Sequence, residues 1–129
     1  MDVETATAIP QSPVAVRVTM RGHTVVQDKP AINGGQDQGP MASELLLAAI
    51  LGCQHSTFVK VAAKRRLAAR IERLEGAMHF ADGDIRKVEV EAHVSGATEG
   101  VDTALRLTEK TCTISRALKV PVEVTWKPA

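Results

Sequence analysis

Residues 41–67, MASELLLAAILGCQHSTFVKVAAKRRL, have the character of one long apolar helix, around which the rest of the chain must fold. Ser43 is a candidate N-cap, and Glu44 is a favourable anion in the first turn. Every residue from Leu45 to Leu51 is apolar, and no solvent-facing stripe begins until Lys60. A helix that is apolar on every side must be covered on every side. One small sheet covers one face, so we expect a second copy of the chain to cover the other; cover by later helices of the same chain is the alternative.

Alternating residues before this helix predict an opening hairpin. Residues 14–20 and 23–27 alternate in the manner of half-buried strands, and Arg21-Gly22 between them is typical of a turn. Residues 1–12 are polar and are expected to form a loose, flexible arm. Residues 28–40 contain three glycines and two prolines, which predicts a loop within the domain.

The second half of the chain predicts a further hairpin, two helices and a last strand. Residues 74–80 and 88–94 alternate as antiparallel strands with one solvated face, joined by a turn at 81–84. Helical spacing follows at 98–110 and 111–118, and residues 120–126 alternate again. The predicted order is β-β-α-β-β-α-α-β, an α+β fold with a mostly antiparallel sheet, as a single domain over residues 13–129.

The composition excludes several functions. The 129 residues include 16 Lys+Arg and 15 Asp+Glu, so there is no basic excess to neutralise nucleic acid phosphates. Aromatic residues make up 2% of the chain, which disfavours a base-stacking platform. The longest unbroken apolar run, 45–53, is shorter than a membrane span, and no secretory signal is visible at the N-terminus. We therefore expect a soluble cytoplasmic protein, where stable disulfides are uncommon.

The two cysteines are the candidates for chemistry. Cys112 is expected at the start of a short helix, between Lys110 and Arg116, and helix N–H groups and nearby cations lower the pKa of a thiol. Cys53 lies inside the apolar helix, where burial raises its pKa, so its reactivity requires a cation from elsewhere. The alternative for each is an inert buried thiol.

Four segments carry a resemblance to the OsmC/Ohr family, the osmotically inducible and organic-hydroperoxide-resistance proteins. GPMASELLLAAILGC at 39–53 resembles the family's central-helix signature, and the loop at 28–40 is similar to one common in OsmC-like members. CTISRAL at 112–118 resembles the second-cysteine motif, although Thr113 stands where many members have Pro, and KVPVEV at 119–124 resembles the closing strand. The resemblance covers about residues 13–129.

This resemblance implies an OsmC-like intertwined homodimer with sheets wrapped around two central helices. It also implies a cysteine-based peroxidase that reduces organic hydroperoxides, in which Cys53 attacks the peroxide and Cys112 resolves the product as a disulfide. A dithiol reductant, of the lipoyl type or a small thiol, then reopens the disulfide. We expect no cofactor and no metal ion.

The family's peroxidases also share an Arg that holds the thiolate and a Glu that orients the Arg. Arg21 matches the Arg best, and Arg17 is second. The family's Glu lies ten residues before the cysteine, where this chain has Ser43. Glu44 is offset by one residue, which turns its side chain by about 100° and places it opposite Cys53, about 13 Å along the helix axis.

Other side chains are possible supports. Thr57 and Lys60 share the helical face of Cys53, so Thr57 is expected to hydrogen-bond the sulfur, while Lys60 is expected to be solvated. His23, next to the early turn, is a possible lining residue, and His55 points away from Cys53. The two remaining histidines are expected on solvated strand faces, and no spacing in the sequence indicates a Cys/His zinc site; they are His79 and His93.

Two functional hypotheses follow. The Cys53/Cys112 pair favours the peroxidase. Ser43 at the Glu position favours the alternative, an OsmC-fold dimer without efficient peroxidase activity that binds a small apolar or acyl ligand.

Overall fold

In the computed structural model, which describes all 129 residues, the quoted stretch forms α1, Ala42–Lys64. The chain forms two compact units, Met1–Leu46 and Leu47–Ala129, and α1 runs from the first into the second. The predicted α+β class and element order are confirmed, with one extra strand at the N-terminus and a short 3-10 helix in the loop. The expectation of one domain over 13–129 stays a prediction.

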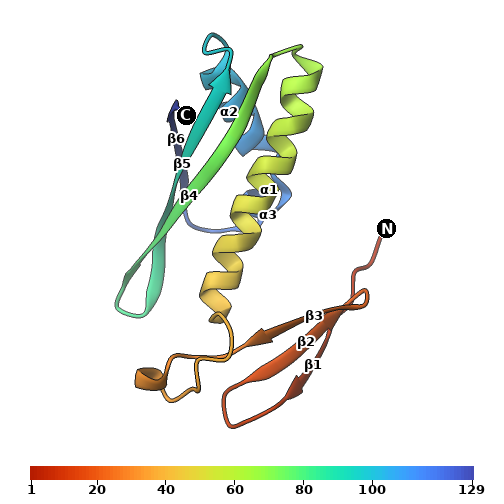
Figure 1. The fold of residues 1–129 in the computed structure, drawn as a ribbon, viewed down its shortest axis with the longest axis vertical. Coiled ribbons are helices and arrows are strands. Elements are labelled where there is room, and N and C mark those ends of the chain that lie inside the picture. Colours follow the sequence, from red (N-terminus) through yellow and green to blue (C-terminus); the bar gives the residue numbers. More distant parts are fainter. The chain divides into compact units, whose positions relative to one another are not determined.

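The first unit contains a three-stranded antiparallel sheet of β1 (Thr7–Pro10), β2 (Val16–Met20) and β3 (His23–Gln27), in that order (Figure 1). The predicted hairpin is present, and its turn residues have φ 47° at Arg21 and φ 79° at Gly22, the left-handed conformation that tight hairpins use. The expectation of a loose arm over residues 1–12 is wrong for 7–10, which pair with β2. All four residues of β1 are exposed, so the strand has no apolar alternation by which to recognise it.

The loop before α1 is organised around one carboxylate. Asp28 is buried, and its oxygens accept backbone N–H bonds from Lys29 at 2.7 Å and from Gln36 and Gln38 at 3.1 Å each. These bonds, that of Lys29 first, hold the pKa of Asp28 below its ordinary value against the opposing effect of burial. The loop includes the 3-10 helix Ala31–Asn33. A buried acceptor thus fixes the path of a segment that has little regular structure.

The start of α1 differs from the expectation for Ser43. The helix begins at Ala42, so Ser43 lies inside its first turn instead of capping it. The Glu44 carboxylate reaches back and accepts the Met41 backbone N–H at 2.8 Å. This is the Glu half of a capping box, in which the third helical residue satisfies the N–H of the cap residue.

In the second unit, α1 packs on a three-stranded sheet. β4 (Ala69–Ala81) and β5 (Asp84–Gly96) form the predicted antiparallel hairpin, and β6 (Val122–Pro128) pairs in parallel with β5. Figure 1 shows α1 and α2 (Val101–Thr111) on the same side of this sheet, and α3 (Thr113–Ala117) follows α2 directly. The core joins both helices to the sheet and includes Phe58, Ala62, Ala92, Val94, Val101, Ala104 and Leu105.

At Gly76 of β4 the sheet lies close against α1. A Cβ atom there would lie 2.9 Å from Leu47 Cδ1 and 3.1 Å from Leu51 Cδ2, so the missing side chain makes room for two leucines of α1. Because side chains alternate along a strand, the neighbouring Glu75 faces the opposite side of the sheet.

The chain's own elements bury only one stripe of α1, formed by Ile50, Gln54, Phe58 and Ala62 at every fourth position. Val59, outside the stripe, is 53% exposed. The later helices therefore do not supply the all-round cover that the apolar sequence requires. By length and composition alone α1 is also long and apolar enough to cross a membrane, a property that it shares with core helices of soluble proteins.

Candidate functional site

The structure brings the two cysteines together in the second unit. Cys53 is half-buried in the middle of α1, and Cys112 is fully buried between α2 and α3. Both are free thiols, and the Cys112 side chain lies close enough to the Cys53 sulfur to lower the pKa of the Cys53 thiol. The two residues are 59 positions apart in the chain, so this contact depends on the packing of α3 against α1.

The backbone at Cys112 explains how α3 reaches the sulfur. Cys112 ends α2 with its N–H donated to the Thr108 carbonyl at 2.8 Å, while its own carbonyl accepts the Arg116 N–H at 3.0 Å. Its conformation between these helices is extended, with φ −64° and ψ 114°. The chain thus turns sharply and begins a new helix, whose first N–H groups have no partner within the helix.

These backbone N–H groups, together with two side chains, lower the pKa of the Cys53 thiol. Burial raises the pKa of its thiol, but hydrogen bonds from the Cys112 side chain, the Ile114 N–H, the Thr57 hydroxyl and the Thr113 N–H lower it, and the net pKa is below the ordinary value. The Thr57 hydroxyl lies 3.9 Å from the sulfur, in the place that the helical spacing indicates. A thiolate is therefore stabilised by donors within one unit, without a cation.

The other predicted residues lie apart from this cluster or have other partners. Arg17, Arg21 and His23 belong to the sheet of the first unit and are exposed, so the pairing of Arg21 with Cys53 stays a prediction. Glu44 is hydrogen-bonded to its own helix start. Lys60 is exposed, in agreement with the prediction of a solvated residue.

One residue at the site was missed by sequence reasoning. Gln54 is 2% exposed, and its Nε2 donates a hydrogen bond to Ser115 Oγ of α3 at 2.9 Å. Its signal in the sequence was a single amide in the otherwise apolar stripe Ile50–Phe58–Ala62. The donors Thr113 and Ile114 had no such signal, since they act through the backbone.

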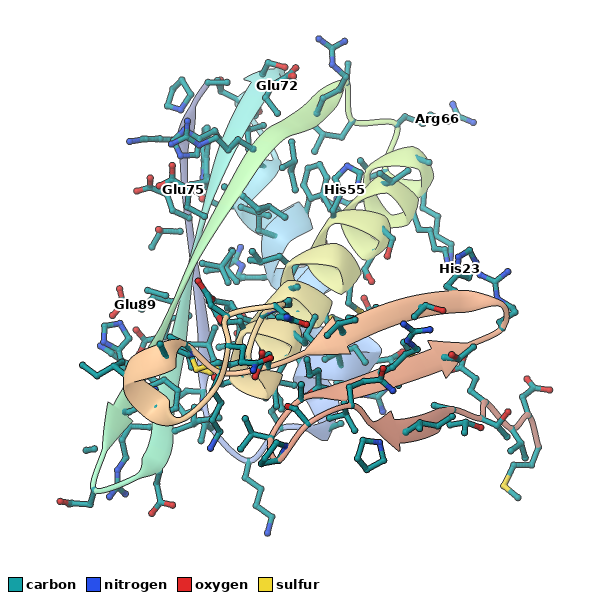
Figure 2. The ribbon with its side chains drawn as sticks, turned by 60° about the horizontal axis from the view of Figure 1, so that its bottom comes forward. His23, His55, Arg66, Glu72, Glu75 and Glu89 are labelled. Carbon is teal, nitrogen blue, oxygen red and sulfur yellow. The ribbon has the colours of Figure 1, made fainter.

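The histidines of the sheet lie beside acidic side chains. Figure 2 shows Glu75 and Glu89 on the side of the sheet turned away from α1. On that face His79 lies 3.1 Å from Glu89, and the largely buried His93 lies 3.2 Å from Glu91. His93 is thus less solvated than its strand position predicted.

The side chains of Glu75, Glu91 and His93 lie close enough together to hold a metal ion. However, Glu75 is paired with Arg73, and Glu91 is paired with Lys127 at 3.3 Å. Since both carboxylates already have cationic partners, an ion-pair network accounts for this cluster.

Comparisons with known proteins agree with this fold. No curated protein matches the sequence. Among solved structures, an OsmC-like protein of unknown function from Vibrio cholerae has a TM-score of 0.78 at 17% identity, covering 98% of this chain and 100% of its own. The organic hydroperoxide resistance protein OsmC from Legionella pneumophila has a TM-score of 0.73 at 17% identity, covering 100% and 98%. An organic hydroperoxide resistance protein from Elizabethkingia anophelis has a TM-score of 0.77 at 16% identity, with the same coverage.

The family model for OsmC-like protein matches residues 35–127, which include α1, both cysteines and all of the second sheet except the last residue of β6. This match covers more than half of the chain and agrees with the resemblance in the sequence. The chain belongs to the OsmC-like protein family.

Proposed function

We propose that this protein is a thiol-dependent peroxidase that reduces organic hydroperoxides. The observation that carries the proposal is the position of the Cys112 side chain next to Cys53, at a site where Thr57 and the backbone N–H groups of α3 also lower the pKa of Cys53. A peroxidase of this kind needs a thiolate nucleophile and a second thiol within reach. Both are present, and they come from separate helices.

The proposed reaction has three balanced steps. The Cys53 thiolate attacks the outer peroxide oxygen, the O–O bond breaks, and with one proton the products are an alcohol and a Cys53 sulfenic acid. The Cys112 thiol then attacks the Cys53 sulfur, which forms the disulfide and releases water. An external dithiol reduces this disulfide and becomes oxidised itself, which restores both thiols.

The substrate class follows from the surroundings of the sulfur. The face of α1 around Cys53 is rich in apolar side chains, and burial of an alkyl chain contributes roughly 0.8 kcal/mol per methylene. This favours an organic hydroperoxide over hydrogen peroxide. Similar structures from L. pneumophila and E. anophelis bear the name organic hydroperoxide resistance protein, which supports the same class.

We also propose that the active species is a homodimer in the cytoplasm. A second copy would cover the apolar residues of α1 that the chain leaves exposed, such as Val59. A reducing compartment keeps Cys53 and Cys112 as the free thiols of the structure. Light scattering should give twice the 13.8 kDa mass of one chain, and a particle of single mass would contradict the dimer.

The decisive experiment is stopped-flow turnover of cumene hydroperoxide with dihydrolipoamide as reductant. We expect Cys53→Ser to abolish turnover and Cys112→Ser to leave Cys53 as a sulfenic acid that dimedone traps. Consumption of peroxide no faster than by free cysteine would refute the peroxidase. Multiple turnovers of Cys112→Ser at the parent rate would refute the resolving role.

A second candidate function has one observation in its favour. Ser43 replaces the carboxylate that the family resemblance leads us to expect, and the Glu44 carboxylate is hydrogen-bonded to the Met41 N–H. A family member without the Arg–Glu pair would keep the fold and bind a small apolar or acyl ligand. Saturable binding of a fatty-acyl probe, together with absent turnover, would favour this function.

A further inference from the structure

The amide of Gln54 is buried in an unusual place. It is 2% exposed on α1, directly after Cys53, and its Nε2 donates to Ser115 Oγ at 2.9 Å. Its Oε1 is buried without a hydrogen-bond partner. Burial of an unsatisfied carbonyl is unfavourable, so an apolar side chain of the same size would suit the packing better. The stripe to which Gln54 belongs is otherwise apolar. We therefore attribute the presence of an amide here to the hydrogen bond that it makes with α3.

The Gln54 amide contacts α3, a helix that needs support from the rest of the fold. This helix has five residues, and none of them is buried. Such a short helix does not persist without tertiary contacts. The Gln54–Ser115 bond is the side-chain hydrogen bond that fastens α3 to α1, and it lies within two residues of the N–H groups that reach Cys53.

We propose that Gln54 is a positioning residue, which clamps α3 against α1 through Ser115 and thereby holds Cys112 and the Thr113 and Ile114 donors on the Cys53 sulfur. The inference gives Gln54 a part in the proposed function. It can nevertheless be tested independently of that function, because the acidity of Cys53 and the proximity of Cys112 are measurable without any peroxide.

The experiment uses Gln54→Met and Ser115→Ala in the full-length reduced protein. Iodoacetamide alkylation of Cys53, followed by mass spectrometry of its peptide across pH, reports the thiolate. We expect each variant to slow alkylation at neutral pH about three- to tenfold, the loss corresponding to about 0.7–1.4 kcal/mol. The midpoint of the pH profile should move upward. In exchange with oxidised glutathione, a mixed disulfide at Cys53 should be displaced by Cys112 about tenfold less effectively.

Two comparisons keep the test specific. Ser56→Ala removes a hydroxyl that bonds the Cys53 carbonyl on the exposed side of α1, at 3.3 Å, and should change neither readout. The double variant Gln54→Met/Ser115→Ala should be no worse than either single variant, because both remove the same bond. Ser115 is only half-buried, so Ser115→Ala should fold even if Gln54→Met does not.

Wild-type alkylation and exchange in Ser115→Ala would overturn the inference. Losses that simply add in the double variant would also overturn it. A wrong peroxidase proposal would give a different result. The wild type would then show no peroxide turnover, while the differences in Cys53 alkylation between the variants would remain.

Discussion

Thr113→Pro separates the chemistry of the site from its stability, because it should move the two in opposite directions. Thr113 is the first residue of α3, and its backbone N–H is one of the donors that lower the pKa of Cys53. Proline has no N–H, so the substitution removes this donor. The first helical position tolerates proline, and the preceding residue must be extended. Cys112 already is, with ψ 114°.

The magnitude follows from the rank of the donor. A hydrogen bond to a charged group contributes about 1.5–3 kcal/mol, and an ordinary one about half of that. Thr113 has the smallest effect among the four groups that lower the pKa of Cys53. We therefore expect its loss to cost no more than an ordinary hydrogen bond, about 0.5–1.5 kcal/mol, so that alkylation at neutral pH should fall by a few-fold. Proline at a compatible site also stabilises the fold by about 0.4–1 kcal/mol, through the unfolded chain.

The assay compares Thr113→Pro with Thr113→Ala, which keeps the N–H. We expect Cys53 alkylation near neutral pH to fall by a few-fold in the proline variant only, while its Tm equals or exceeds that of the wild type. Wild-type alkylation in a folded Thr113→Pro protein would refute the claim that this N–H stabilises the thiolate. A lower Tm would show that α3 does not begin at Thr113 in the conformation described.

Asp28→Asn should lower the free energy of unfolding in urea at neutral pH, since it removes the charge that accepts three backbone N–H bonds. The pKa of Asp28 is lowered in the folded state. Its stabilising effect is therefore present above the unfolded-state pKa of about 3.9 and is lost as the pH falls through the folded-state pKa. The difference in the free energy of unfolding between wild type and variant should accordingly disappear in acid. Gly39→Ala would place Cβ 2.0 Å from the Val26 carbonyl oxygen and should destabilise the protein by at least about 1–3 kcal/mol in thermal unfolding. Gly76→Ala meets only the flexible ends of Leu47, at 2.9 Å, and Leu51, at 3.1 Å, and should cost clearly less; equal losses at the two glycines would contradict this reasoning.

The sequence predicted those parts of the fold that depend on periodicity. The apolar run at 45–51 and the strands around the turn at 81–84 carry strong patterns, and both form as expected. β1 was missed because an exposed strand of four residues has no pattern. The helix cap was misplaced because Ser43 is the usual residue type, whereas the structure uses the Glu44 side chain instead.

The candidate site was predictable by residue type but not by contact. The cysteines and Thr57 were identified from the sequence, and the structure brings them together. The expectation that Cys53 needs a cation from elsewhere stays a prediction, but the structure adds backbone donors of α3 that already lower the pKa of Cys53. Backbone N–H donors are the same in almost every residue type, so the sequence does not mark them. Only the three-dimensional position of the helix break at Cys112 shows that these N–H groups point to Cys53.

This local supply of donors changes what an arginine would contribute to the reaction. If the thiolate is already stabilised within the second unit, Arg21 would act on the peroxide, by stabilising the charge that develops on the departing oxygen. Loss of one such donor costs about 10²–10³ in rate, whereas the thiol itself should alkylate almost as before. Arg21→Ala should therefore slow peroxide reduction far more than alkylation of Cys53; the same pattern in Arg17→Ala instead would transfer the role to Arg17, the second match in the sequence. A parallel loss of both rates in Arg21→Ala would show instead that the arginine acts on the thiol, and that the donors of α3 do not suffice.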